Sequence, residues 1–132
     1  MPNIIKTIQA LPQLLPLKPA SVAEISDAEK QLGLQFSEEY KEYLGAFGAI
    51  LADGIAITGI ARSEDRSVVM VTKQEREFNP DIPDNLYVVE NIGIDGILIW
   101  QDENGKIFST SPNVPPEEIA SSLSAYLTSK QV

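Results

Sequence analysis

Asp102 and Glu103 are adjacent carboxylates and the first residues that suggest chemistry. Two carboxyl groups held a fixed distance apart act as general acid and general base in the cleavage of glycosidic bonds. Neighbouring residues of a strand or turn tend to point in different directions, however, and this pair lies at a predicted hairpin tip. We therefore interpret the two carboxylates as solvated turn residues rather than as a catalytic pair.

Two further segments resemble ligand-binding loops. The turn DENGK is rich in oxygen ligands, but it lacks the alternating acids and the distal glutamate of an EF-hand, so it does not predict a calcium site. The segment GIDG contains Gly93 and Gly96, yet no helix with free N-terminal amides follows it to bind a phosphate. This segment favours a hairpin bend that presents Asp95 outward.

The chain contains no cysteine and no histidine. Zinc sites built from nitrogen and sulfur ligands, disulfides, thiol nucleophiles and histidine general bases are therefore excluded. Carboxylate, lysine or tyrosine chemistry and an oxygen-ligand cation site remain open. We expect none of them, and hence no enzymatic activity, no cofactor and no metal.

The net charge of −9 is unevenly distributed. The first twenty residues carry Lys6 and Lys18 and no acid, whereas positions 81–103 contain no lysine or arginine. The carboxylates in that later stretch are Asp81, Asp84, Glu90, Asp95, Asp102 and Glu103. This acidity argues against binding to nucleic acids or anionic membranes. Two interpretations stay open: the acids keep the protein soluble, or they attract a basic protein partner.

The first half of the chain predicts three helices. Apolar residues at helical spacing indicate a short helix over 3–11, and the prolines of 12–19 indicate an extended connector. Ser21 and Glu24 have the spacing of a capping box, and the helix that they open ends at Gly33. Ser37 is the predicted N-cap of the third helix, which ends at Gly48. Its apolar stripe consists of Tyr40, Tyr43, Leu44 and Phe47.

The second half predicts strands and two more helices. IAITGI (55–60) is typical of a strand, and 66–78 is ambiguous between strand and helix, of which we favour the helix. LYVVENIG and GILIWQD predict two strands joined around 94–96, and the second turns through 103–106 into KIFST. Trp100 is expected in the core rather than as an exposed anchor. Pro115-Pro116 followed by Glu117-Glu118 predicts a closing amphipathic helix.

The element order predicts an α+β fold, a small antiparallel sheet with helices packed mainly on one face. A chain of 132 residues is expected to form a single domain, 1–132, with an N-terminal helix and connector over 1–20 and the core over 21–132. No apolar run approaches the ~20 residues of a membrane span, and the amino-terminal segment lacks a signal-peptide pattern. We therefore expect a cytoplasmic protein.

The run EISDAEKQLGLQFSEEYKEYLGAFGA resembles the opening signature of the SUKH superfamily, the SMI/KNR-type immunity protein domain. The matching residues are Glu29, Leu32, Gly33, Tyr40, Tyr43, Leu44 and Gly48. GIDGILIWQDENGKIF resembles the central strand pair of the family and IASSLSAYL its final helix. The resemblance covers about residues 20–128 and is most specific over 25–48. This chain has Phe36-Ser37 where the family usually has Leu-Pro, and Gly48-Ala49 where it usually has a glycine pair.

Members of that superfamily are largely bacterial immunity proteins that bind and block polymorphic toxins, often nucleases; others are regulators of cell-wall synthesis, adaptors or scaffolds. The resemblance thus implies a non-enzymatic antitoxin whose partner is a basic protein toxin. The alternative is a regulatory or scaffold module with no toxin partner. An acidic protein can occupy a phosphate-binding cleft by imitating its charge. The residues predicted to bind the partner are Asp53, Glu64, Asp65, Asp95, Asp102 and Glu103.

Overall fold

The structure is a computed structural model that describes residues 3–130. Within this range the chain is a mixed α+β fold of five helices and seven strands. The helices are α1 (Ile4–Gln9), α2 (Val22–Leu32), α3 (Glu38–Phe47), α4 (Val68–Phe78) and α5 (Leu123–Lys130). The strands are β1 (Leu15–Pro16), β2 (Ile50–Ala52), β3 (Ile55–Ile57), β4 (Tyr87–Asn91), β5 (Leu98–Gln101), β6 (Ile107–Ser111) and β7 (Val114–Ala120).

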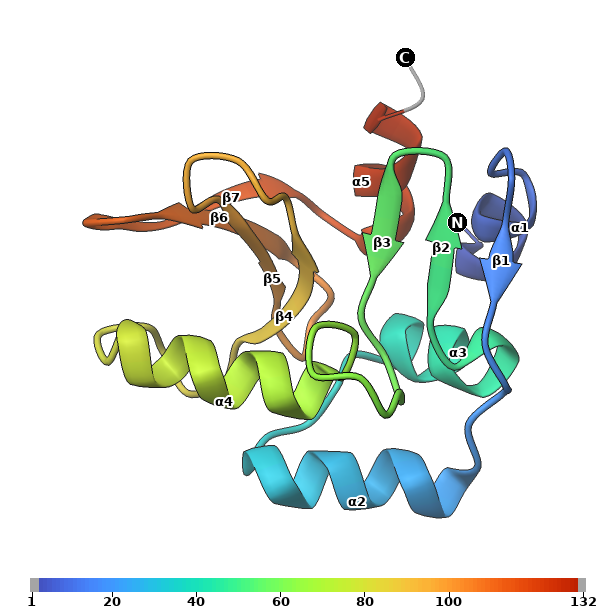
Figure 1. Ribbon diagram of the computed structural model, residues 1–132, viewed down its shortest axis with the longest axis horizontal. Helices are drawn as coiled ribbons and strands as arrows, with labels where there is room; N and C mark the ends of the chain where they lie inside the picture. Colours follow the sequence, from blue (N-terminus) through green and yellow to red (C-terminus); the bar gives the residue numbers. More distant parts are fainter. Residues whose placement is uncertain (1–2, 131–132) are drawn as a thin grey trace.

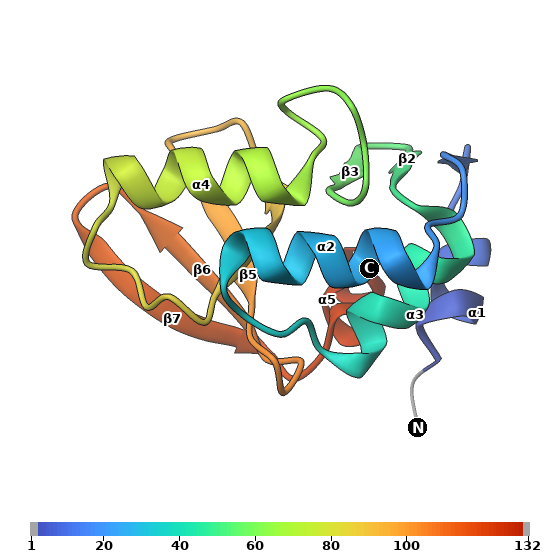
Figure 2. The ribbon, with the colours of Figure 1, turned by 90° about the horizontal axis from the view of Figure 1, so that it is seen from below.

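The strands form two antiparallel sheets, with orders β1-β2-β3 and β4-β5-β6-β7. In Figure 1 the four-stranded sheet curves over α4, and the three-stranded sheet stands between it and α1. Seen from below, α2 and α4 lie side by side (Figure 2). Alternate side chains of a strand point to opposite faces of the sheet. In β4, Val88 therefore packs on the α4 side, whereas Tyr87 packs in the larger hydrophobic core.

The predicted helix signals of the first half are confirmed. The Ser21 hydroxyl accepts the Glu24 N–H at 3.1 Å, and the Glu24 carboxylate accepts the Ser21 N–H at 2.9 Å. The hydrogen bond from the Ser21 backbone N–H is the main reason that the pKa of Glu24 lies below its ordinary value. Gly33 ends α2 in the left-handed conformation, with φ of 67°. The Ser37 hydroxyl caps α3, and the predicted apolar stripe of that helix is buried.

The ambiguous segment 66–78 forms a helix, as favoured by its sequence, and α4 begins after Ser67 as N-cap. Trp100 is fully buried, and its indole N–H donates to the Thr110 hydroxyl at 2.8 Å. Trp100 is therefore a core residue, as predicted. None of the helices within 3–130 combines the length and apolar character that a membrane crossing demands.

The predicted closing helix was placed too early. Residues Val114–Ala120, including Pro115, Pro116, Glu117 and Glu118, form β7, and α5 begins only at Leu123. β7 pairs antiparallel with β6, and the register of this pairing shifts at two places. Prolines are tolerated there because β7 is an edge strand with bulges and need not donate every backbone N–H.

The prediction of one small sheet omitted two short strands. β2 pairs with β3 as a hairpin around Asp53-Gly54, and β1 adds to the other edge of β2. β1 lies in the predicted connector, and β2 lies directly after α3. Strands of two or three residues carry too little alternation to be recognised from sequence.

Close backbone packing beside this small sheet requires glycine. A Cβ on Gly59 would overlap the carbonyl oxygen of Gly48, and a Cβ on Gly48 would overlap that of Lys18. Gly48 also has φ of 75°, which side-chain-bearing residues rarely adopt. The two glycines thus bring the connector, the end of α3 and the segment after β3 into contact.

Candidate protein-binding surface

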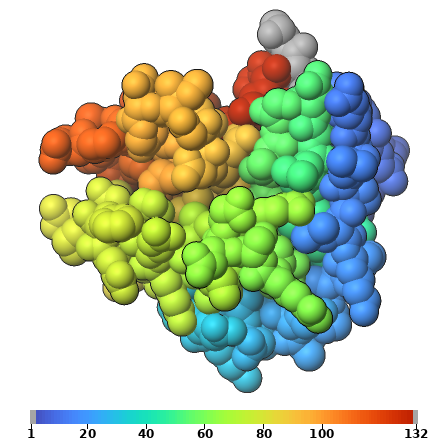
Figure 3. Space-filling model, viewed as in Figure 1, coloured from blue at the N-terminus to red at the C-terminus, as the bar shows by residue number. Residues whose placement is uncertain are grey.

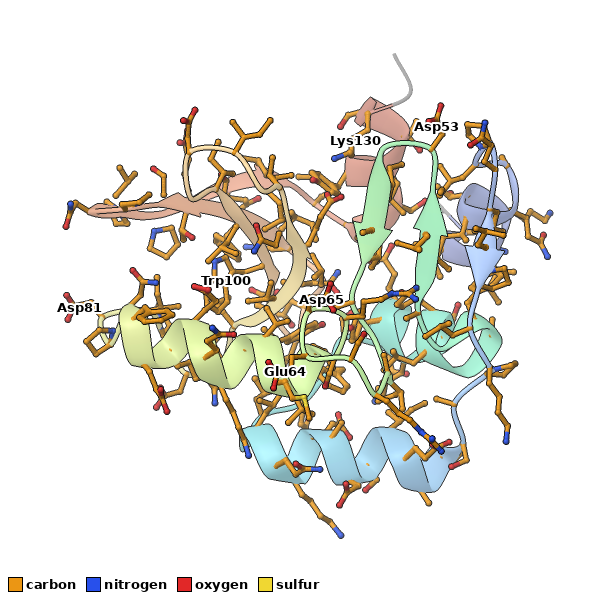
Figure 4. The ribbon with its side chains drawn as sticks, in the orientation of Figure 1. Asp53, Glu64, Asp65, Asp81, Trp100 and Lys130 are labelled. Atoms are coloured by element: carbon orange, nitrogen blue, oxygen red, sulfur yellow. The ribbon has the colours of Figure 1, made fainter. Side chains whose placement is uncertain are left out.

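Five of the six predicted partner-binding residues are exposed, but they occupy different parts of the surface. Asp53 lies in the β2–β3 turn, and Glu64 and Asp65 lie in the loop that precedes α4 (Figure 4). Asp95 and Glu103 flank β5 at its opposite ends. The acidic run of 81–103 is therefore not one continuous strip on the structure.

Asp102, the sixth predicted residue, is only 8% exposed. One oxygen of its carboxylate accepts the backbone N–H groups of Asn104 and Lys106 at 3.0 and 2.9 Å. These bonds close the turn between β5 and β6. Asp102 thus shapes the turn that presents its exposed neighbour Glu103. Both residues lie at the turn, as predicted, but the prediction that Asp102 is solvated was wrong, because its carboxylate is buried by its bonds to the turn.

Glu90, from the same acidic run, is 3% exposed. One of its carboxylate oxygens accepts the Tyr126 hydroxyl at 2.5 Å and the Lys130 ammonium at 3.0 Å. The other oxygen accepts the Ala56 N–H at 3.3 Å. Burial and the hydrogen bond to Glu90 both raise the pKa of Tyr126. The Glu90 carboxylate thereby joins β3, β4 and α5.

Glu39 is a structural carboxylate that sequence reasoning missed. It extends from the first turn of α3 and accepts the backbone N–H groups of Leu123 and Ser124 at 2.7 and 2.9 Å. It also accepts the Gln101 side-chain N–H at 3.0 Å. Glu39 therefore caps the N-terminus of α5 from a distant part of the chain, and its sequence position next to Glu38 gives no sign of this.

The four tyrosines of the chain have hydroxyl groups engaged inside the fold. Tyr40 and Tyr43 both donate to the Thr58 carbonyl, at 3.1 and 2.8 Å. Tyr87 donates to the Gln101 side chain at 2.9 Å. Burial is the main reason that the pKa of each tyrosine, Tyr126 included, is raised. These hydroxyls stay protonated and hold elements together.

A cleft of about 440 Å³ opens between the β2–β3 hairpin and the β4–β5 turn, and we name it the hairpin cleft. Figure 3 shows it as the hollow between the green hairpin and the orange turn. Its lining is mixed: Ile55, Ile92 and Ile94 are among the apolar residues, and Glu90 and Lys130 are the charged ones. Asp53 and Asp95 are chain neighbours of lining residues, one in each of the two turns.

A second groove, of about 420 Å³, lies between the end of α4 and the β6–β7 hairpin. Phe78 and Val114 line it and are 69% and 48% exposed. Asp81 is its charged lining residue. Across residues 3–130, no three acidic side chains come together in a way that could hold a metal ion.

Comparison with known proteins adds two findings. The family model SUKH_5, described as SMI1-KNR4 cell-wall, matches residues 1–131. A crystal structure of a protein from Pseudomonas syringae pv. tomato superposes with a TM-score of 0.74, covering 97% of this chain and 96% of that one. Its sequence is 14% identical, so this likeness concerns the fold alone. No curated protein matches the chain.

Proposed function

Because the chain belongs to the SMI1-KNR4 (SUKH) family, we propose that it is a non-enzymatic immunity protein that binds a toxin in the cytoplasm and blocks it. The proposed partner is a basic protein, and the nuclease domain of a polymorphic toxin is the class that fits best. Family membership across residues 1–131 is the observation that carries this proposal.

The surface charge supports a basic partner. Within residues 3–130, ion pairs join Lys41 to Glu38, Lys106 to Glu118 and Lys130 to Glu90. Most of the 19 acidic residues therefore have no cationic partner in the fold. A nuclease presents lysine and arginine around its cleft to bind phosphate, so an exposed excess of carboxylates would attract it and accelerate association.

The state of the reactive groups supports binding rather than catalysis. The tyrosine hydroxyls are hydrogen-bonded inside the fold, and their pKa values are raised by burial. The least exposed carboxylates, Glu90 and Asp102, are hydrogen-bonded within the fold as well. The exposed carboxylates are spread over helices, turns and the edge strand β7, which suits contact with a large partner.

A regulatory or scaffold role is the second candidate. The matching family is described as SMI1-KNR4 cell-wall. A module that takes part in cell-wall regulation needs the same stable fold and an exposed binding surface. Such a module would bind a protein without neutralising a toxin. Toxin rescue therefore separates the two candidates.

The test is to search the reading frames beside the gene for a toxic domain and to co-express that domain with this chain, scored by survival and by a complex on a sizing column. We expect rescue and a complex that weakens as salt is raised. A complex without rescue would favour the scaffold role. Neither rescue nor complex would overturn the immunity proposal.

A further inference from the structure

We propose that the hairpin cleft is a docking slot for an arginine side chain that projects from the partner protein. This inference rests on the proposed function in one respect, namely that the partner is a basic protein. The cleft offers three features that such a side chain needs: isoleucine side chains in its walls, a nearly buried carboxylate among its lining residues and two exposed aspartates next to lining residues.

The walls fit the aliphatic part of the arginine. Ile55 is buried, Ile92 is half-buried, and Ile94 is 63% exposed at the entrance. A tight turn after Ile94 holds it there. Asp95 and Gly96 both adopt positive φ, 55° and 69°, and the Ile97 N–H donates to the Ile94 carbonyl at 3.0 Å. A long side chain lying along these residues buries its methylene groups while its charged head reaches further in.

Glu90, the nearly buried carboxylate of the lining, fits the guanidinium group. One oxygen of Glu90 is occupied by Tyr126 and Lys130, but the other accepts only the Ala56 N–H at 3.3 Å. A carboxylate oxygen has two lone pairs, so this second oxygen has capacity for another donor. Arginine presents several N–H groups in a fixed plane and suits a partly occupied carboxylate better than lysine does.

The chain's own Lys130 shows that a cation is accommodated beside Glu90, and it also balances the charge of that carboxylate, so the negative charge left for a partner comes from Asp53 and Asp95. Its ammonium lies 3.0 Å from the Glu90 carboxylate and 5.2 Å from the centre of the Tyr126 ring. Lys130 is the one cationic residue that lines the cleft within the described chain. Counting Glu90, Asp53 and Asp95 against Lys130, the cleft and its entrance keep an excess of negative charge.

The groove beside α4 is the competing surface. It is more openly apolar because of Phe78 and Val114, but its one charged lining residue is the exposed Asp81. A basic partner would gain an apolar contact there without a buried carboxylate to receive its charge. For this reason the charge complementarity favours the hairpin cleft.

The test with the toxin uses two matched pairs of variants. Ile94→Lys places a cation at the cleft entrance, and Phe78→Lys makes the same kind of change at the competing groove. Asp53→Asn with Asp95→Asn removes two entrance charges, and Glu42→Gln with Glu77→Gln removes two exposed charges from α3 and α4, at residues that were not predicted to bind the partner. Asparagine tolerates the positive φ of Asp95, so the fold is preserved.

We expect Ile94→Lys to weaken toxin binding by at least about tenfold, as for a central contact of an interface. The Asp53/Asp95 variant should slow association about tenfold at low salt, and less at physiological salt. Both controls should change the dissociation constant by less than about twofold. If the toxin binds and Ile94→Lys has no more effect than Phe78→Lys, the cleft inference is overturned and the immunity proposal stands.

A second measurement needs no toxin. The amide NMR spectrum of the chain is recorded during titration with an oligoarginine peptide and, as a neutral control, with oligocitrulline of equal length. We expect saturable shifts at 52–56 and 90–95 that Asp53→Asn/Asp95→Asn removes and Glu42→Gln/Glu77→Gln keeps. Shifts centred elsewhere, or equal shifts with oligocitrulline, would overturn the inference. Cleft shifts without any toxin rescue would support the slot and count against the immunity proposal alone.

Discussion

Replacing Glu39 by glutamine removes the charge that caps α5 while keeping the size of the side chain. In the native fold its two carboxylate oxygens accept the N–H groups of Leu123 and Ser124 at 2.7 and 2.9 Å. In the Glu39→Gln variant one oxygen becomes an NH₂ group. One backbone N–H of α5 then faces a donor instead of an acceptor.

The expected loss follows from three overlapping contributions. Hydrogen bonds to a charged group contribute about 1.5–3 kcal/mol, an N-cap contributes ~1 kcal/mol, and the favourable charge at a helix N-terminus contributes ~0.3–1 kcal/mol. Because the same carboxylate supplies all three and the glutamine retains one acceptor, we expect a net loss of about 2 kcal/mol in the free energy of unfolding. In a chain of this size this lowers Tm by about 8 °C.

Urea unfolding followed by the fluorescence of Trp100 measures this change, since Trp100 is the one tryptophan and is fully buried. Glu38→Gln is the matched control. Glu38 is next in sequence but its side chain is 88% exposed, and its surface ion pair with Lys41 contributes at most ~1 kcal/mol. Equal unfolding free energies for the two variants would refute the assignment of Glu39 as the cap of α5.

Further predictions concern packing, turn geometry and pH. Gly59→Ala should destabilise the protein by at least about 2 kcal/mol, because the added Cβ overlaps Gly48. Gly45 lies in α3, and a Cβ added there has no atom within 4 Å, so Gly45→Ala should stabilise the protein by ~0.5–1 kcal/mol. Chemical denaturation measures both changes. Asp102→Ala should cost about 1–2 kcal/mol by leaving two turn N–H groups without their acceptor, and Glu103→Ala less than ~0.5 kcal/mol, measured in the same way. Burial raises the pKa values of the four tyrosines. Above about pH 10 the unfolded chain therefore releases tyrosine protons that the folded chain retains. As a result, the free energy of unfolding falls by up to ~1.4 kcal/mol per pH unit for each tyrosine. Tyrosinate absorbance should therefore rise in one step with loss of circular dichroism, and separate titration of individual tyrosines in folded protein would contradict this.

The sequence predicted those elements whose signals are local. The capping box of Ser21 and Glu24, the Ser37 cap and the Asn104-Gly105 turn each lie within a few residues of the structure they determine, and all appear as expected. The helix-like run KQEREF similarly favoured a helix for α4 despite its β-branched start. In each case the responsible interaction is visible in a short window.

The predictions were wrong where the pairing of strands far apart in the sequence determines the local structure. Two prolines followed by two glutamates suit the first turn of a helix as well as an edge strand, and only the register with Ile107–Ser109 selects β7. β1 likewise exists because Leu15 and Pro16 pair with residues of β2, far along the chain. Neither pairing leaves a trace in the local pattern.

The candidate site shows the same division among carboxylates. Glu38 and Glu39 are equivalent as first-turn acids of α3, yet only Glu39 meets α5, whose Leu123 is 84 positions away. Asp102 and Glu103 are adjacent, and only Glu103 is exposed. A count of acidic residues therefore overstates the charge available to a partner, because some carboxylates serve the fold.

The positions of the acidic residues, rather than their number, therefore determine how each contributes to binding a basic partner. Exposed acids such as Glu64 and Asp65 raise the rate of encounter but are screened by salt and surrounded by water. A buried carboxylate such as Glu90 acts through a lower dielectric and with fixed geometry, so it affects the lifetime of a complex. At the hairpin cleft, the exposed Asp53 and Asp95 are next in sequence to residues that line the cleft together with Glu90. This surface can therefore increase both the association rate and the lifetime of a complex. Association should consequently depend on salt through the entrance residues, whereas dissociation should depend on Ile94 and on the access it gives to Glu90.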